Sequence, residues 1–380
     1  MGSEVDKFLS IYKNKTFDEV PFCEGDIVVA GYLSYCNFFE HPKFHKFDLE
    51  NNAIPFDSFH TKADAQILSS KNLNPKEIKK FLNLLFLSKR YRHFKVGYMK
   101  NVFGHEDGAT QFFALTVIAK KYNIIIFRGT DPTITGWKED LDLTFKKNIP
   151  SHGLAKKYVY KIASISDKPL IIVGHSKGGH LAYYAFLASS NTIKSKIYRV
   201  YNLDGPGFND NRFRPEDYKD KLIKIVPSSS IFGLLLEYTN NYEIIKSSKK
   251  NVDAHDLLTW EFSKSSRYKD LRRMPSLSKY SLALKIAIFE WYNKYSKSDF
   301  KNLTEFIYQV AISNKQVTVL NLKLDVIKKR KIYLDKIAKY NKAKKDKLKL
   351  MSRDFVKIYF SILFHIKDYD LETLRLKGLN

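Results

Sequence analysis

The stretch PLIIVGHSKGGHLAYYA, residues 169–185, constrains the fold of this chain more than any other feature. Its apolar run Leu170–Val173 is typical of a buried strand, and apolar residues then recur at the spacing of one helix face. Ser176 lies between the two, with Gly174 and Gly178 two residues away on either side. A serine hydroxyl is a weak nucleophile unless it is held exposed beside a base, and a tight strand-to-helix turn flanked by small residues achieves this. The pattern predicts a nucleophile elbow with Ser176 at its apex.

Strand-like runs continue on both sides of this stretch. From Lys95 onward they read KVGYMKNVF, QFFALTVIA and NIIIF, and after the elbow they read IYRVYNL and KLIKIV. Helix-length segments such as SHGLAKKYVYKIASIS separate the later runs. This alternation predicts a mostly parallel sheet with crossover helices, which is an α/β fold.

The flanking parts of the chain read as helical. We expect a helix from Pro75 toward Arg90, with Asn74 as its cap and Pro75 in the first helical position. After Trp260 the strand signal ends, and SLALKIAIFEWYNKY, DFKNLTEFIYQVAI and DFVKIYFSILFHI have helical spacing. The sequence therefore predicts three parts: an N-terminal helical segment over residues 1–91, an α/β core over 92–264 and a basic α-helical region over 265–380.

Composition narrows the class of protein. With 44% hydrophobic and 14% aromatic residues the chain can bury a sizeable core, and no apolar run approaches the length of a membrane span. Two cysteines, Cys23 and Cys36, have neither metal spacing nor a disulfide framework, and the first residues do not resemble a secretory signal. These features indicate a cytoplasmic location. The net charge of +25 favours anionic partners, but without a zinc-finger, RNP-like or Walker motif nucleic acid is disfavoured.

A second segment suggests how a reacting ester would be stabilised. It reads NIIIFRGTDPTITGWKEDLDLTF and covers residues 123–145. An oxyanion needs two preorganised N–H donors, one from the residue after the nucleophile and one from a turn that ends an earlier strand. The backbone N–H groups of Lys177 and Thr130 occupy these two places in the sequence.

With these motifs the chain resembles a known family. FRGTD, then a Trp and DL, then DLTF and finally GHSKGG are similar to the class 3 lipase group of α/β-hydrolases, over residues 95–260. The GHSKGG form resembles a bacterial branch with no settled substrate. The resemblance implies an α/β-hydrolase fold, attack of Ser176 on an ester, and an oxyanion-hole role for the residue at the Thr130 position.

The general base of this fold is a histidine that follows the nucleophile in the chain. The candidates are His180, His255 and His365. His180 would lie one turn beyond Ser176 on the same helix, and His365 lies in the lysine-rich tail. His255, in the segment NVDAHDLLTW after the last strand run, is the predicted base.

The acidic residue that would pair with the histidine is not where class 3 lipases have it. Class 3 lipases usually place an Asp just after the strand that corresponds to KLIKIVP, but SSSIFG follows here. Asp204, in VYNLDGPGF, ends the preceding strand, where active-site loops of parallel sheets gather, and it is the predicted partner of His255. A turn-forming role before Gly-Pro-Gly is the alternative for Asp204. Asp253 and Asp256 would shape the loop around the histidine, and Glu237 is a further candidate.

Together these residues predict a serine hydrolase that cleaves a carboxylic ester, with a lipid or another acyl ester as substrate. No metal or organic cofactor is implied. A thioesterase or a peptidase would use the same residues, so the bond that is cleaved stays open, as does the oligomeric state. The alternative is a non-catalytic α/β-hydrolase-like scaffold that binds an anionic membrane or an acidic partner through its basic C-terminal helices.

The C-terminal region contains a candidate membrane-binding helix. Residues 321–350 hold twelve Lys or Arg against three Asp, and apolar residues recur at helical spacing: Leu324, Ile327, Leu334 and Ile337. A basic amphipathic helix can lie on an anionic membrane, which would make the protein membrane-peripheral. The alternative is that the apolar stripe packs on the hydrolase core while the lysines face water.

Overall fold

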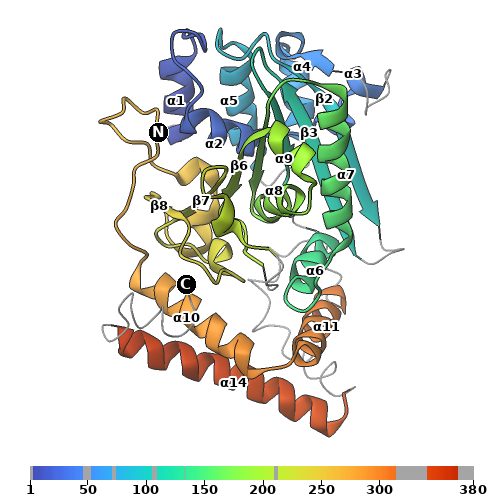
Figure 1. Cartoon of the computed structure of the whole chain (residues 1–380), viewed down its shortest axis with the longest axis vertical. Coiled ribbons are helices and arrows are strands. Elements are labelled where there is room, and N and C mark those ends of the chain that lie inside the picture. Colours follow the sequence, from blue (N-terminus) through green and yellow to red (C-terminus); the bar gives the residue numbers. More distant parts are fainter. Residues whose placement is uncertain are drawn as a thin grey trace.

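The computed structural model describes residues 3–45, 53–70, 74–104, 109–131, 133–208, 213–313 and 340–366. Its centre is an eight-stranded sheet in which strands that follow one another in the chain are neighbours (Figure 1). The strands are β1 (Ala53–Pro55), β2 (Lys95–Gly104), β3 (Thr110–Ile118), β4 (Asn123–Phe127), β5 (Leu170–His175), β6 (Ile197–Leu203), β7 (Leu222–Pro227) and β8 (Glu243–Ile245). Pairing is antiparallel from β1 to β4 and parallel from β4 to β8.

Helices cover both faces of this sheet. One face carries α1 (Glu4–Tyr12), α2 (Glu24–Leu33) and α5 (Pro75–Phe86), and the other carries α7 (Pro150–Ile165), α8 (Lys177–Leu187) and α9 (Asn191–Lys196). Because side chains alternate along a strand, Ile124 and Ile126 enter the first core while Ile125 and Phe127 enter the second. Three further helices belong to the described part of this region: α3 (Pro42–His45), α4 (Lys62–Leu68) and α6 (Ile134–Asp142).

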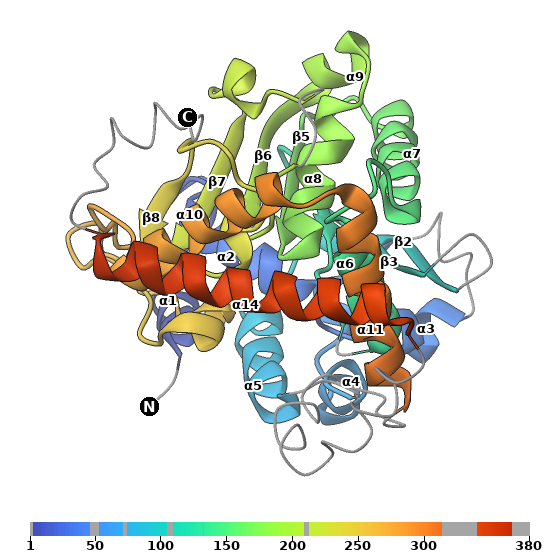
Figure 2. The same cartoon turned by 90° about the horizontal axis from the view of Figure 1, so that it is seen from below.

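A separate helical layer follows the sheet in the chain. It consists of α10 (Lys279–Lys294), α11 (Lys297–Ser313) and α14 (Lys342–Phe364). Seen from below, α14 runs across the molecule beside α10 (Figure 2). Ala283, Ile286 and Ala287 of α10 share a buried apolar cluster with Ile362 of α14, so the two helices pack along one another.

The predicted fold class is confirmed: the chain has an α/β-hydrolase type of sheet with helical segments before and after it. The runs expected as strands form β2 to β7, whereas the short edge strands β1 and β8 were not predicted. Asn74 occupies the cap position of α5, but its side chain makes no capping hydrogen bond. Of residues 321–350, only those from 340 onward are described. The domain boundaries stay predictions.

Within the described ranges, no helix combines the length and the apolar character that crossing a bilayer requires.

Candidate active site

Ser176 occupies a strained turn between β5 and α8. Its backbone has φ 57° and ψ −130°, a combination that costs a residue with a side chain about 1–3 kcal/mol. Ser176 lines a cavity of about 950 Å³, and its hydroxyl forms no hydrogen bond with any described residue. Such strain persists only where the surrounding structure imposes it, so the turn is a candidate functional site.

Gly174 and Gly178 allow the turn to be this tight. A Cβ atom on Gly174 would collide with the backbone of Gly178, and a Cβ atom on Gly178 would collide with the carbonyl group of Phe127 at the end of β4. The two glycines therefore let α8 begin directly against the ends of β4 and β5, as expected of a strand-to-helix elbow.

Asp204 and His255 are brought together from distant parts of the chain. Asp204 Oδ2 lies 2.7 Å from His255 Nδ1, and the carboxylate is fully buried at the end of β6. Its second oxygen, Oδ1, accepts a hydrogen bond from Ser230 Oγ at 2.5 Å. The His255 side chain is 19% exposed and lines the same cavity as Ser176, but no hydrogen bond joins it to Ser176 in the described part of the chain. Catalytic hydrogen bonds are often long without substrate, so this geometry is compatible with a triad.

Two of the other candidate carboxylates, those of Asp256 and Glu237, have different roles. Asp256 Oδ1 accepts from the backbone N–H of Leu258 at 3.0 Å and so shapes the loop. Glu237 pairs with buried Lys224 and accepts from Thr239. These contacts leave Asp204 as the carboxylate that meets the histidine ring.

A second histidine holds the His255 loop in place. His175 Nε2 donates to the backbone oxygen of His255 at 2.8 Å, while its Nδ1 accepts from the hydroxyl of Tyr35 at 2.6 Å. Burial, together with the nearby His255, lowers the pKa of His175 well below its usual value, so the ring stays neutral with its proton on Nε2. Tyr35 was not found from the sequence, because it is 140 residues from His175 in the chain.

The Thr130 segment lies directly beside the elbow. A Cβ atom on Gly129 would lie 3.0 Å from the Cβ atom of Ser176. The side chain of Thr130 donates to Asp140 Oδ2 at 2.5 Å, which connects this turn to α6. Burial raises the pKa of Asp140 to about 6. Neither Thr130 nor Lys177 uses its backbone N–H in a hydrogen bond to a described residue, and Lys177 begins α8, where the helix dipole favours negative charge.

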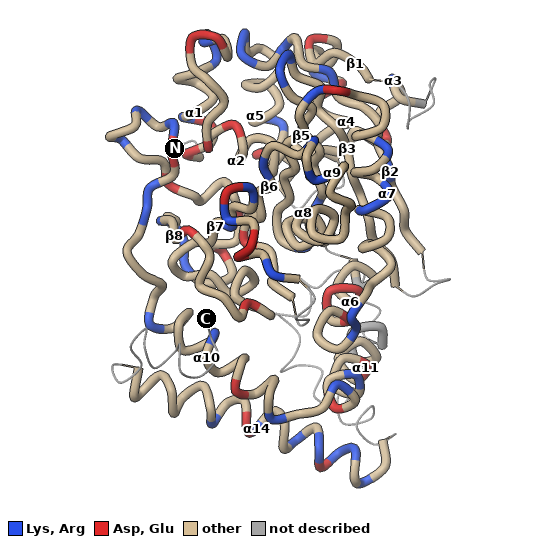
Figure 3. Tube along the Cα trace, in the orientation of Figure 1, with Lys and Arg blue, Asp and Glu red and all other residues tan. Residues whose placement is uncertain are grey.

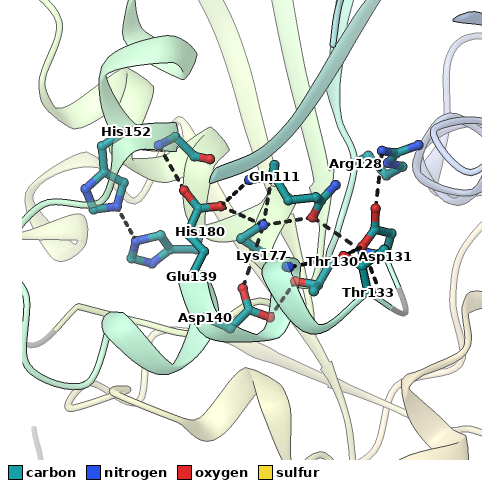
Figure 4. A network of polar contacts seen from close by, with 12 residues as sticks. Gln111, Arg128, Thr130, Asp131, Thr133, Glu139, Asp140, His152, Lys177 and His180 are labelled. Atoms are coloured by element: carbon teal, nitrogen blue, oxygen red, sulfur yellow. Dashed lines mark hydrogen bonds and ion pairs between the residues drawn. The ribbon is translucent and has the colours of Figure 1, made fainter. Parts of the chain in front are cut away.

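The side chain of Lys177 has a role that sequence reasoning missed. It is 1% exposed, and its Nζ donates to Gln111 O at 2.8 Å, to Gln111 Oε1 at 2.9 Å and to Glu139 Oε2 at 2.9 Å (Figure 4). Glu139 is itself buried and accepts from the backbone N–H groups of Gln111 and Ser151, at 3.1 and 3.0 Å. The network therefore joins β3, α6, the start of α7 and the elbow.

His180, the rejected base candidate, forms a buried pair with His152. The two Nε2 atoms lie 2.8 Å apart (Figure 4). His180 Nδ1 lies 2.9 Å from the Gly207 carbonyl oxygen. His180 therefore holds its proton on Nδ1 and accepts from His152 through Nε2. Burial lowers the pKa of His180 to about 4. This ring is used within the fold, and it does not line the cavity around Ser176.

Because of the His152–His180 pair, we expect the free energy of unfolding to fall in mild acid. The folded state keeps His180 neutral down to about pH 4, whereas the unfolded chain takes up a proton near pH 6.5. Stability from this group is thus present above pH 6.5 and falls as the pH drops, by about 2 kcal/mol between pH 7 and pH 5. Urea unfolding at pH 7 and at pH 5 measures this difference in the free energy of unfolding. His180→Gln should reduce this pH dependence, whereas exposed His365→Gln should not; equal slopes in wild type and His180→Gln would contradict the assignment.

No cluster of three or more His, Cys, Asp or Glu side chains is arranged to hold a metal ion in the described ranges.

Comparison with known proteins shows which family the sequence matches. The sequence model of a family described as Mbeg1-like matches residues 85–309, a segment that contains Thr130, Ser176, Asp204 and His255. No curated protein matches the chain. Among solved structures, a triacylglycerol lipase from Penicillium expansum is similar at 15% identity and a TM-score of 0.26, over 34% of this chain and 58% of the lipase chain. The likeness thus spans little more than half of the lipase.

Proposed function

Because this chain belongs to the Mbeg1-like family, whose matched segment contains the whole candidate site, we propose that this site is the active site of a serine hydrolase. The proposal is that the enzyme cleaves a carboxylic ester of a lipid or another acyl group. One observation carries it above the others. A buried Asp204 holds His255 at 2.7 Å in the wall of the cavity that the strained Ser176 also lines. A merely structural turn has no need for this combination.

Each residue then has a defined task. His255 Nε2 takes the proton of Ser176 Oγ as the oxygen attacks the ester carbonyl carbon. Asp204 accepts from Nδ1–H, which fixes the tautomer and stabilises the imidazolium. The backbone N–H groups of Thr130 and Lys177 stabilise the oxyanion. His255 next protonates the leaving alcohol, and a water deprotonated by the same histidine releases the acid from the acyl-enzyme.

A fluorophosphonate tests this proposal most directly. The reagent phosphonylates an activated serine, so one adduct on Ser176 is expected, located by peptide mass spectrometry. Labelling should be lost in heat-denatured protein and in His255→Ala, since activation needs the folded site. An unreacted protein, or an adduct on another serine, would overturn the assignment.

The second candidate is a non-catalytic scaffold that binds an anionic membrane through its basic C-terminal helices. It is favoured by exposed Val356, Phe360 and Phe364 in the second half of α14, which follows a lysine-rich first half whose charges Figure 3 shows. The predicted helix over 321–350 lies largely outside the described residues. Under this candidate the protein sediments with anionic but not neutral vesicles, half-molar salt releases it, and it does not react with the fluorophosphonate. Changing Lys328, Lys329, Arg330 and Lys331 to Gln should weaken that sedimentation.

A further inference from the structure

The cavity beside Ser176 has one wall that comes from the C-terminal helices. Helices α10, α11 and α14 contribute six residues to it, all of them apolar or aromatic: Leu284, Ile288, Trp291, Tyr292, Phe300 and Phe355. These helices are rich in lysine, yet none of their charged side chains is among the described residues that line the cavity. Lys285 of α10, for example, points elsewhere and donates to Thr239 O at 2.7 Å and to Asn240 Oδ1 at 2.8 Å.

The polar atoms of this wall are already bonded within the protein. Trp291 Nε1 donates to the backbone oxygen of Met351 at 2.9 Å, and the hydroxyl of Tyr292 donates to the carbonyl of Thr144. The ring of Trp291 also contacts Phe300 and Phe355, with centroids 4.8 and 5.0 Å away. The wall is therefore fixed in place, and it offers a ligand only apolar surface.

The apolar surface begins at the candidate catalytic histidine. The ring of Phe232 lies 4.4 Å from the ring of His255, and Trp137 meets Phe232 edge-on at 6.5 Å. All three line the same cavity as the C-terminal wall. A group bound at Ser176 would thus continue from the reacting carbonyl onto apolar side chains.

We propose that this wall binds the acyl chain of a long-chain ester, so that the C-terminal helices select the substrate. The inference rests on the proposed function, because Ser176 places the carbonyl carbon from which the chain extends. The volume of about 950 Å³ is at the upper end for small-ligand sites, more than a short acyl group fills. Each methylene group that the wall takes from water raises kcat/KM by up to about fourfold.

A series of p-nitrophenyl esters from acetate to laurate, kept below their micelle concentrations, tests the proposal. We expect kcat/KM for laurate to exceed that for butyrate by on the order of 100-fold. Ile288→Trp fills the cavity and should lower this laurate-to-butyrate ratio about tenfold or more. Phe355→Ala removes apolar surface from the wall and should also lower this ratio, by a smaller factor than Ile288→Trp. Phe360→Ala, on the outer side of α14 where Phe360 is 47% exposed, should leave the ratio unchanged.

A binding measurement separates this inference from the proposed function. Calorimetric titration of Ser176→Ala with lauric acid should show binding that Ile288→Trp weakens at least tenfold. Laurate binding without turnover of any ester would contradict the proposed function but support the binding of acyl chains by this wall. Equal turnover of all chain lengths without laurate binding would overturn the wall and keep the hydrolase.

Discussion

Ser176→Ala should lower kcat for ester hydrolysis by on the order of 10⁵ or more, with no change in the urea midpoint of unfolding. The substitution removes one oxygen atom that no described residue uses as a hydrogen-bond partner, so nothing in the fold depends on it. The reaction, in contrast, has no nucleophile in this variant, and only the oxyanion donors and the binding pocket still contribute to catalysis. The measurement is steady-state hydrolysis of a soluble acyl ester by protein free of contaminating esterases. Turnover within tenfold of wild type would remove Ser176 from the mechanism.

The two partners of Ser176 should follow the same pattern. His255→Ala is expected to match the serine variant in severity, because the members of a catalytic unit are not additive. Asp204→Asn should lower kcat by on the order of 10⁴, since an amide in place of the carboxylate favours the wrong tautomer of His255. Asp253→Asn and Glu237→Gln are the matched controls, as neither carboxylate meets the histidine ring in the structure. Full activity of Asp204→Asn beside an inactive control would reassign the acid.

Local patterns were sufficient to predict the central fold. The strands β2 to β7 are apolar runs bounded by turn residues, and each such signal lies within a few neighbouring positions. The elbow could also be predicted from neighbouring positions. Side chains at positions 174 and 178 would collide with the backbone, so the turn needs the glycines that the sequence has there. β1 and β8 were missed because strands of three residues at the sheet edges are too short for a periodic pattern.

Contacts across the chain were beyond sequence reasoning. The choice of Asp204 relied on where strand ends meet in a parallel sheet, a rule that places a residue at the site without fixing its partner. No comparable rule points to Tyr35, whose hydroxyl reaches His175 from the turn that follows α2. The apolar wall from α10, α11 and α14 could not be predicted either, because helical spacing shows that a helix face is apolar but not which part of the protein it contacts.

Lys177 is a residue of the site whose side-chain contacts could not be predicted from the sequence. The sequence assigned a role to its backbone N–H, and its long charged side chain next to the nucleophile would ordinarily be taken as solvent-exposed. In the structure that side chain is buried and its ammonium group meets Glu139, whose carboxylate is fully buried. Such a pair is costly to place in the core and still more costly to break, because removing one partner leaves an uncompensated charge.

Lys177→Met should therefore lower the free energy of unfolding by about 3–5 kcal/mol, measured by urea denaturation near neutral pH. Methionine fills much of the space but leaves the Glu139 carboxylate without its cation and removes one donor from each of two oxygen atoms of Gln111. Lys15→Met is the matched control, because Lys15 and Glu19 form an ion pair at the surface, where the loss should be small.

Adding Glu139→Met to Lys177→Met should restore only part of the lost stability. The double variant removes the unpaired charge, but the backbone N–H groups of Gln111 and Ser151 then lose their acceptor. An unfolding midpoint of Lys177→Met equal to that of the wild type would show that the network contributes nothing to the fold. A stable Lys177→Met with reduced kcat at unchanged KM would instead place the network in the positioning of the elbow, since α8 presents the proposed oxyanion donor through the backbone of this same residue.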